Sequence, residues 1–265
     1  MSPRDDVLQA SHGEYHVHSW GNPDAHYVAL IAHGIGEHAR RYDHVADALV
    51  ADGAAVYAPD HYGHGHSAGE RALVADIEAY VDDLHLVAQR ATAEHPDLPV
   101  VLIGHSLGGV IATRYAQRHM HELAALVLSG PVIGGNPGFE PLLAMDPMPD
   151  VPIDLAALSR DPAVGEAYAA DPLIYHGPLH RESLQTIFDA VQTIAQGPKF
   201  ELPTLWIHGE LDPLAPYAAT REAVDRLRTD QVSEKMYPGA MHEIFNETNQ
   251  DEVIADVIAF IDAHV

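Results

Sequence analysis

The pattern of apolar and polar positions along the chain predicts an alternation of strands and helices. Strands are expected near residues 14–20, 27–32, 54–58, 98–103, 124–129, 203–208 and 232–237, and several of these segments are short apolar runs between turn residues, which are typical of buried strands. Apolar positions at spacings of three and four predict helices at 41–52, 74–95, 107–119, 217–228 and 250–264. Because strands that alternate with helices form parallel sheets, we expect an α/β fold with a mostly parallel central sheet flanked by helices.

A Gly-x-Ser-x-Gly motif, Gly104 to Gly108, stands where a predicted strand gives way to a predicted helix. A sharp strand–turn–helix of this kind exposes the central serine at the carboxyl end of the strand, where backbone N–H groups can bind an oxyanion. The two glycines leave room for backbone to approach backbone. Ser106 is therefore a candidate nucleophile, and the alternative is that it only caps the helix.

A serine nucleophile needs a histidine base and a carboxylate that orients the histidine. Asp212 lies in the loop after the sixth predicted strand, and His242 lies in the loop after the last one. Because functional groups collect outside the carboxyl ends of parallel strands, we expect both side chains to lie close to Ser106. Asp212 could instead be a turn residue before a proline, and Glu210 is the other carboxylate within reach.

Five blocks of the chain together resemble the monoacylglycerol lipase family of α/β-hydrolases, in particular its bacterial members. The blocks are His33-Gly-Ile-Gly-Glu-His38 with Arg41-Tyr42, Asp60-His-Tyr-Gly-His-Gly-His-Ser67, Gly104-His-Ser-Leu-Gly-Gly109, His208-Gly-x-x-Asp212 and Gly239-x-x-His242. The resemblance extends from about residue 14 to the end, and the first block is its most specific part. Many members have Met where this chain has Leu107, and Arg is frequent where Tyr62 stands. Neither departure touches the chemistry, because Leu107 would act through its backbone N–H.

The resemblance implies an α/β-hydrolase fold and a set of site residues. These are the triad Ser106, Asp212 and His242, and the oxyanion-hole donors Ile35 and Leu107, which act through backbone N–H groups. It also implies a glycerol-sized polar pocket with Glu37 and Arg41 as substrate contacts, although these two charges could simply pair within their loop. A further contact found in some members cannot be carried over, because Phe245 stands at that position.

The closely spaced histidines His61, His64 and His66 could suggest a metal site, since zinc favours such ligands. They match the Asp-His-x-Gly-His-Gly pattern of the resembled family, in which this loop is structural and its histidines are hydrogen-bonded. We therefore expect neither a metal nor another cofactor, and triad catalysis needs none. His119 and His121 are expected to be surface residues at a helix end.

Residues 131–198 interrupt the alternation of strands and helices. They hold ten of the chain's 19 prolines, which disfavour long sheet pairing and shorten helices. We expect them to form a cap (lid) inserted over the active site, and residues 1–130 and 199–265 to form the hydrolase core. The apolar residues of this cap can line a tunnel for a hydrocarbon chain or simply pack on the core. They include Phe139, Leu142, Leu143, Met145, Met148, Val151, Ile153, Leu155 and Leu158.

Composition narrows the possible partners. A chain of 265 residues suits one large α/β domain, and its formal charge of −25 repels nucleic acid and anionic headgroups. The absence of cysteine excludes disulfides and zinc–thiolate sites. Neither a signal peptide nor a membrane-spanning apolar run is visible. We therefore expect a cytoplasmic protein that binds no nucleic acid and that can meet lipid surfaces transiently through its cap, peripheral to a membrane.

The sequence thus predicts a serine carboxylester hydrolase that cleaves monoacylglycerols to free fatty acid and glycerol through an acyl-enzyme. One alternative is a broader carboxylesterase for other small monoesters, such as phthalate monoesters, which would use the same residues. The other is a ligand-binding α/β-hydrolase with low turnover. An intact set of nucleophile, acid, base and oxyanion loop argues against a purely binding role.

Overall fold

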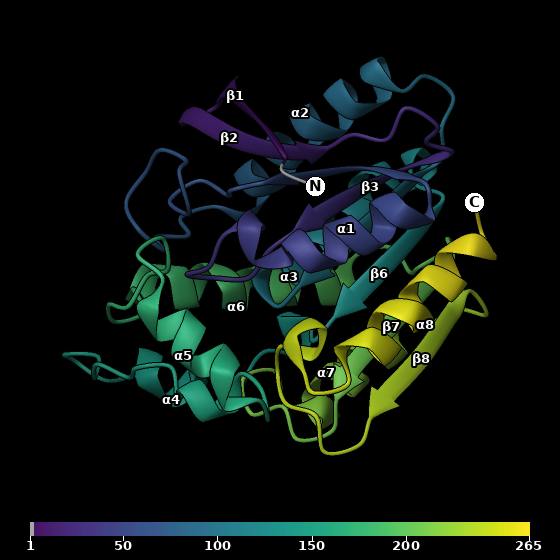
Figure 1. Cartoon of the computed structure of the whole chain (residues 1–265). Helices are drawn as coiled ribbons and strands as arrows, with labels where there is room; N and C mark the ends of the chain where they lie inside the picture. The colour runs from purple at the N-terminus through teal and green to yellow at the C-terminus, as the bar shows by residue number, and fades with distance from the viewer. Residues whose placement is uncertain (1–2) are drawn as a thin grey trace.

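A central sheet organises the molecule (Figure 1) and has eight strands. The computed structural model describes residues 3–265, and its strand order is β1-β2-β4-β3-β5-β6-β7-β8. The pairs β1–β2 and β2–β4 are antiparallel, and all other neighbours are parallel. The strands are β1 (Arg4–Ala10), β2 (Gly13–Trp20), β3 (Tyr27–Ala32), β4 (Ala54–Pro59), β5 (Val100–His105), β6 (Ala125–Ser129), β7 (Thr204–Gly209) and β8 (Val232–Tyr237). The expected mostly parallel α/β sheet is confirmed.

Helices cover both faces of this sheet (Figure 1). One face packs against α1 (Asp43–Asp52) and α8 (Gln250–Asp262), and the other against α2 (Ile77–Glu94), α3 (Leu107–His119) and α7 (Tyr217–Leu227). Every residue of β3 to β7 is buried, as expected of parallel strands with helices on both sides. Short 3-10 helices lie at Ala39–Tyr42 (η1), Met120–Glu122 (η2), Val132–Gly134 (η3), Leu155–Ala157 (η4) and Ile244–Asn246 (η5).

The segment between β6 and β7 contains α4 (Glu140–Leu143), α5 (Pro162–Ala170) and α6 (Arg181–Gln196). The expectation that proline keeps all helices here short is wrong for α6, which has 16 residues. Its sequence lies between Pro178 and Pro198 and contains no proline. Ala190 and Ile194 of α6 are buried in the main core, so part of this segment is anchored to the sheet layer.

The N-terminal strand β1 is absent from the elements that the sequence predicts. It begins with Arg4, Asp5 and Asp6 and lies at the edge of the sheet, so no apolar run marks it. The predicted core begins at residue 1, and residues 1–2 lie outside the described part. Within residues 3–265, no helix combines the length and the hydrophobicity that a bilayer crossing would need.

Candidate active site

Ser106 occupies a strained turn between β5 and α3. Its backbone has φ 55° and ψ −116°, a left-handed conformation that a non-glycine residue adopts only where the surroundings enforce it. A Cβ at Gly108 would lie 2.0 Å from the carbonyl oxygen of Ala32, and a Cβ at Gly104 would lie 2.4 Å from that of Gly108. Both glycines of the motif are therefore required for the close packing of α3 on the sheet.

The structure brings Ser106, His242 and Asp212 together in one chain of hydrogen bonds. The Ser106 hydroxyl donates to His242 Nε2 at 2.9 Å, and His242 Nδ1 donates to Asp212 Oδ2 at 2.7 Å. The three residues lie just after the carboxyl ends of β5, β7 and β8. Because these strands are parallel, their carboxyl ends lie on the same side of the sheet. This arrangement can draw a proton from the serine and hold the resulting imidazolium.

Asp212 is kept ionised by its surroundings. Its Oδ1 accepts the N–H groups of Leu214 and Ala215 at 2.9 and 2.8 Å. Burial opposes the charge, but the charge of His242 and its hydrogen bond prevail, so the pKa of Asp212 is lowered. The alternative that Asp212 only shapes a turn does not account for its contact with His242, although its Oδ1 does cap that turn.

The pKa of His242 shifts in the opposite direction, upwards. Burial favours the neutral imidazole, but the charge of Asp212 and its hydrogen bond outweigh burial and raise the pKa of His242. The other carboxylate considered, Glu210, lies apart from this pair and accepts the N–H of Gly239. The geometry therefore favours Asp212 as the partner of the histidine.

Ile35 and Leu107 both line the cavity in front of Ser106. A Cβ at Gly34 would lie 3.1 Å from the Ser106 Cβ, so the loop that carries Ile35 runs directly beside the serine. His33 stabilises this loop from behind, because its Nδ1 donates to the carbonyl oxygen of Gly34 at 2.8 Å. The backbone of both proposed donors thus borders the serine, and their role in binding an oxyanion stays a prediction.

Glu37 and Arg41 form a buried ion pair, and Arg41 also pairs with Glu243. Arg41 donates to Glu37 Oε2 at 2.7 Å and forms a two-pronged pair with Glu243 at 2.6 and 2.7 Å. Burial opposes the charge of Glu37, but the charge of Arg41 and the hydrogen bond from the Gly34 N–H help to lower its pKa to about 2. Glu37 and Glu243 line the cavity, and Arg41 bridges them. Sequence reasoning missed Glu243, whose only signal was its position directly after His242.

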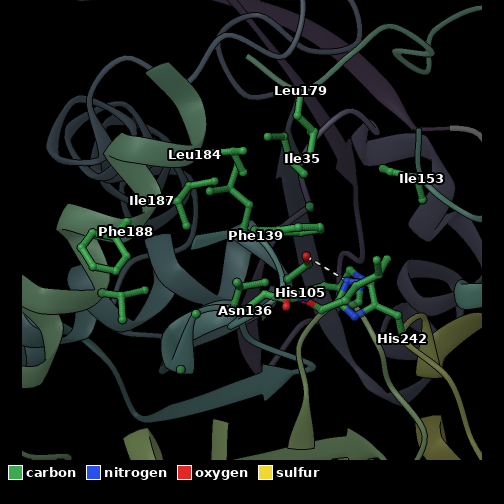
Figure 2. A pocket seen from close by; sticks show the side chains of 18 of the residues that line it. Ile35, His105, Asn136, Phe139, Ile153, Leu179, Leu184, Ile187, Phe188 and His242 are labelled. Atoms are coloured by element: carbon green, nitrogen blue, oxygen red, sulfur yellow. Dashed lines mark hydrogen bonds between the residues drawn. The ribbon is translucent and has the colours of Figure 1, made fainter. Parts of the chain in front are cut away.

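An apolar cavity of about 260 Å³ is lined by Ser106 and His242. Figure 2 shows Leu184, Ile187 and Phe188 of α6 at the end remote from His242, with Phe139 between the two ends. Of the apolar residues expected to line a tunnel, Phe139, Leu143, Ile153 and Leu158 do so. Met145 and Leu155 are 47% and 37% exposed instead. The lining from α6 was missed, because that helix was not predicted.

The loop that carries His242 is bonded to the segment between β6 and β7. The N–H groups of His242 and Glu243 donate to the carbonyl oxygens of Ala157 and Leu158 at 3.2 and 2.7 Å. Further along, Arg160 pairs with the buried carboxylate of Glu247 at 2.9 Å. The position of His242 therefore depends on contacts with this segment as well as on its own strand.

The histidine-rich loop is held by hydrogen bonds within the protein. The N–H of His61 donates to His33 Nε2 at 2.9 Å, and His64 Nδ1 donates to the carbonyl oxygen of Tyr62 at 2.9 Å. The N–H of His66 donates to the carboxylate of Asp60 at 2.8 Å. In the described part of the chain, the one group of three possible metal ligands within reach of one another lies elsewhere, at His85, His119 and Glu122.

The chain is similar to a family of known hydrolases. Residues 23–249 match the family described as "Serine aminopeptidase, S33". The chain is 39% identical over 252 residues to a monoacylglycerol lipase of Mycolicibacterium smegmatis, covering 91% of this chain and 90% of that protein. It is 32% identical to the human monoglyceride lipase over 238 residues, 86% of this chain and 78% of the relative.

Solved structures share the same architecture. A monoglyceride lipase of Saccharomyces cerevisiae superposes with a TM-score of 0.88 at 22% identity, covering 100% of this chain and 96% of that one. A monoacylglycerol lipase of Paleococcus ferrophilus gives a TM-score of 0.82 at 24% identity, covering 98% and 100%. At these identities the likeness speaks for the fold, which is that of the α/β-hydrolases.

Proposed function

The chain belongs to the monoacylglycerol lipase family of α/β-hydrolases, within the group described as serine aminopeptidase S33, and on that premise we propose that it hydrolyses monoacylglycerols to free fatty acid and glycerol. One observation carries the proposal. The hydrogen-bonded set of Ser106, His242 and Asp212 borders an apolar cavity of about 260 Å³, which Ser106 and His242 line. A nucleophile that lines an apolar cavity suits an ester whose acyl part is a hydrocarbon chain.

In the proposed reaction Ser106 attacks the ester carbonyl while His242 Nε2 takes its proton. Asp212 holds the imidazole in the required tautomer and stabilises its cation. The backbone N–H groups of Ile35 and Leu107 bind the oxyanion of the tetrahedral intermediate. His242 then returns the proton to the departing alcohol, which leaves an acyl-enzyme. A water molecule, deprotonated by His242, releases the fatty acid and restores the serine.

The apolar and the charged parts of the cavity suit the acyl chain and the alcohol of the substrate, respectively. We assign the acyl chain to the apolar part of the cavity and the alcohol to the region of Glu37 and Glu243, which line it beside the catalytic pair. Their carboxylates can accept hydrogen bonds from the hydroxyls of glycerol. Arg41 is already committed to both carboxylates, so it is not free to pair with a substrate carboxylate. A phthalate monoester, which carries such a group, would bury an unpaired charge and should be a poor substrate.

We also propose that residues 131–198 act as the cap, with residues 3–130 and 199–265 as the described part of the core. The supporting observation is that most of the apolar cavity lining, including Phe139, Ile153 and Phe188, comes from this segment. Transient contact of the cap with a lipid surface is part of the same proposal, and the exposed side chains of Met145 and Leu155 support it. The cytoplasmic location stays a prediction.

The decisive experiment compares kcat/KM for one acyl chain presented as the mono-, di- and triglyceride, with an aminoacyl amide and a phthalate monoester as further substrates. The monoglyceride should be cleaved fastest, because further chains have no room beside Glu37 and an aminoacyl ammonium would enter the apolar part of the cavity. Equal cleavage of the triglyceride, or faster cleavage of the amide, would overturn the assigned substrate and leave Ser106 as a nucleophile of other specificity.

A cavity-filling variant tests the acyl assignment. Ile187→Trp should reduce kcat/KM for long-chain esters far more than for acetyl esters, because each displaced methylene loses about 0.8 kcal/mol of burial. Met145→Trp is the matched control, since Met145 is 47% exposed and lies off the cavity lining. Equal losses for both chain lengths in Ile187→Trp would show that the acyl chain lies elsewhere.

A further inference from the structure

Two histidines and a glutamate gather far from Ser106, where α2 meets the end of α3. His85 lies on α2, His119 is the last residue of α3, and Glu122 ends η2. One possible ligand atom from each lies within 4.8 Å of the other two. The two imidazole rings stack with their centroids 4.1 Å apart. The sequence predicts that His119 is a surface residue, yet its side chain is only 18% exposed.

The spacing of these groups is compatible with ligation of one ion. His85 Nδ1 lies 3.4 Å from Glu122 Oε2, and His119 Nδ1 lies 3.4 Å from Glu122 Oε1. This exceeds the usual range for a hydrogen bond between such groups. It is close to the edge of a tetrahedral zinc site, about 3.4 Å for metal–ligand bonds of roughly 2.1 Å.

The surroundings leave the carboxylate of Glu122 available to an ion. The neighbouring cation Arg118 is already paired with Glu78 and Asp82.

A second layer of groups is also present. The Gln89 amide lies 3.0 Å from His85 Nε2. With its amide turned, Gln89 would accept a proton from Nε2 and leave Nδ1 free for a metal, as partners of metal-bound histidines commonly do. The Tyr115 hydroxyl lies 3.2 Å from Glu122 Oε2, to which it donates, and 3.1 Å from His85 Nδ1.

We propose that His85, His119 and Glu122 bind one divalent transition-metal ion, with zinc as the best match to two imidazoles and a carboxylate. Binding requires the two stacked rings to turn until their Nδ1 atoms converge on the ion. The fourth position falls to water or to the exposed His121, whose Nε2 lies 3.8 Å from the same carboxylate. The ion would clamp α2 to the end of α3 and stabilise the fold.

The site is remote from the chemistry. Helix α3 begins directly after Ser106 and has 13 residues, so His119 lies about 20 Å along the helix from the serine. Metal binding should therefore change stability and leave ester hydrolysis unchanged. This separation lets the proposal fail without affecting the proposed function.

The test is a titration of the metal-stripped full chain with ZnCl₂ by calorimetry, alongside thermal melts and the visible spectrum of added Co²⁺. We expect one saturable equivalent, a higher Tm with zinc, and a tetrahedral Co²⁺ spectrum. Glu122→Gln and the double variant His85→Ala/His119→Ala should each bind at least tenfold more weakly and lose the zinc-dependent rise in Tm. His264→Ala, which removes an exposed histidine at the other end of the chain, should behave like the unmodified protein.

Two results would overturn the proposal. One is the absence of saturable binding in the unmodified chain. The other is binding that persists in Glu122→Gln and in the double variant, which would show that zinc binds among the other histidines of this chain. Glu122 is a partly exposed residue, so Glu122→Gln keeps the fold and remains informative even where the double variant is destabilised.

Discussion

Two groups of buried histidines in this molecule have opposite electrostatic surroundings. His242 beside Ser106 is 4% exposed, and His33, His61 and His64 behind the oxyanion loop are 0%, 0% and 2% exposed. Burial lowers the histidine pKa in both places. At His242 the carboxylate of Asp212 reverses that effect and raises the pKa. In the second group burial is reinforced by the neighbouring imidazoles, and the pKa of His64 falls to about 3.

The difference shows that a charged partner, rather than burial, decides which histidine can serve as a base. A base must accept a proton in the transition state. Of the four histidines compared, only His242 has a carboxylate hydrogen-bonded to its ring to stabilise the resulting cation. The rings of His33, His61 and His64 pack on one another and stay neutral, so they shape the loop that borders Ser106. The same residue type is therefore a candidate catalyst in one place and a packing element in the other.

Removal of the partner of His242 should have the largest effect. Asp212→Asn should lower kcat by roughly 10⁴, because the imidazole loses both its tautomer control and its stabilising charge. Asp60→Asn is a matched control, since Asp60 is also a buried carboxylate paired with a histidine, His18. It should keep kcat within about tenfold of the unmodified enzyme, by the same comparison of triad and non-triad groups. Similar losses of kcat in the two variants would remove the distinction drawn between the two groups.

The pH profile of catalysis should report the raised pKa of His242. The base must be neutral to act, so kcat/KM should fall about tenfold per pH unit below that pKa. Because its surroundings raise the pKa of His242, the acid limb should begin at a higher pH than for a histidine of ordinary pKa. The measurement is kcat/KM for an uncharged ester between pH 5 and 9. A limb that begins near pH 4 would mean that the base has an environment like that of His105, whose pKa is about 4.

Stability should depend on pH with the sign set by the histidines that are buried in the neutral form. A histidine with a lowered pKa contributes stability that is complete above the unfolded value of about 6.5 and is lost as the pH falls toward the folded value. His61, His64 and His105 all have strongly lowered pKa values. As the pH falls, these three histidines take up protons in the unfolded chain but not in the folded one. Each contributes about 1 kcal/mol over this window, so the free energy of unfolding should drop by about 3 kcal/mol between pH 6.5 and 5.5.

Urea unfolding at these two pH values tests the sign directly. Unpaired carboxylates remain largely ionised in this window, so they add little to the change. His18 and His242, whose pKa values are raised, lose their contribution only as the pH rises above 6.5. A free energy of unfolding that rises on acidification would contradict the picture of histidines buried in the neutral form.

The sequence was informative where a local pattern decides the structure. The apolar run at residues 27–32 located β3 with the bounds observed, and the chain order of Ser106, Asp212 and His242 predicted which side chains meet. The fold and the candidate triad follow from such runs, because a buried parallel strand is apolar throughout and delivers its following loop to one edge of the sheet.

Features that depend on distant partners could not be predicted. Arg41 and Glu243 are 202 positions apart, and nothing in the sequence around either residue indicates that the two side chains will pair. Strand β1 opens with charged residues and pairs only because β2 offers an edge. Helix α6 was hidden by the proline content of its surroundings, although its own 16 residues contain none. In each case the decisive contact arises only in the folded chain.

The smallest expected effect isolates the packing role of the second group. His64→Gln keeps a donor near the carbonyl oxygen of Tyr62, which His64 Nδ1 reaches at 2.9 Å, but it loses the ring that packs against His33 and Tyr80. The free energy of unfolding at pH 7 should fall by roughly 1–2 kcal/mol, the usual cost of a disturbed buried polar contact. His242→Gln, the same change in the first group, should abolish turnover and leave stability nearly unchanged. Urea unfolding and kcat/KM measured on both variants complete the comparison, and a loss of turnover in His64→Gln beyond about tenfold (1.4 kcal/mol) would show that the packed histidines take part in catalysis.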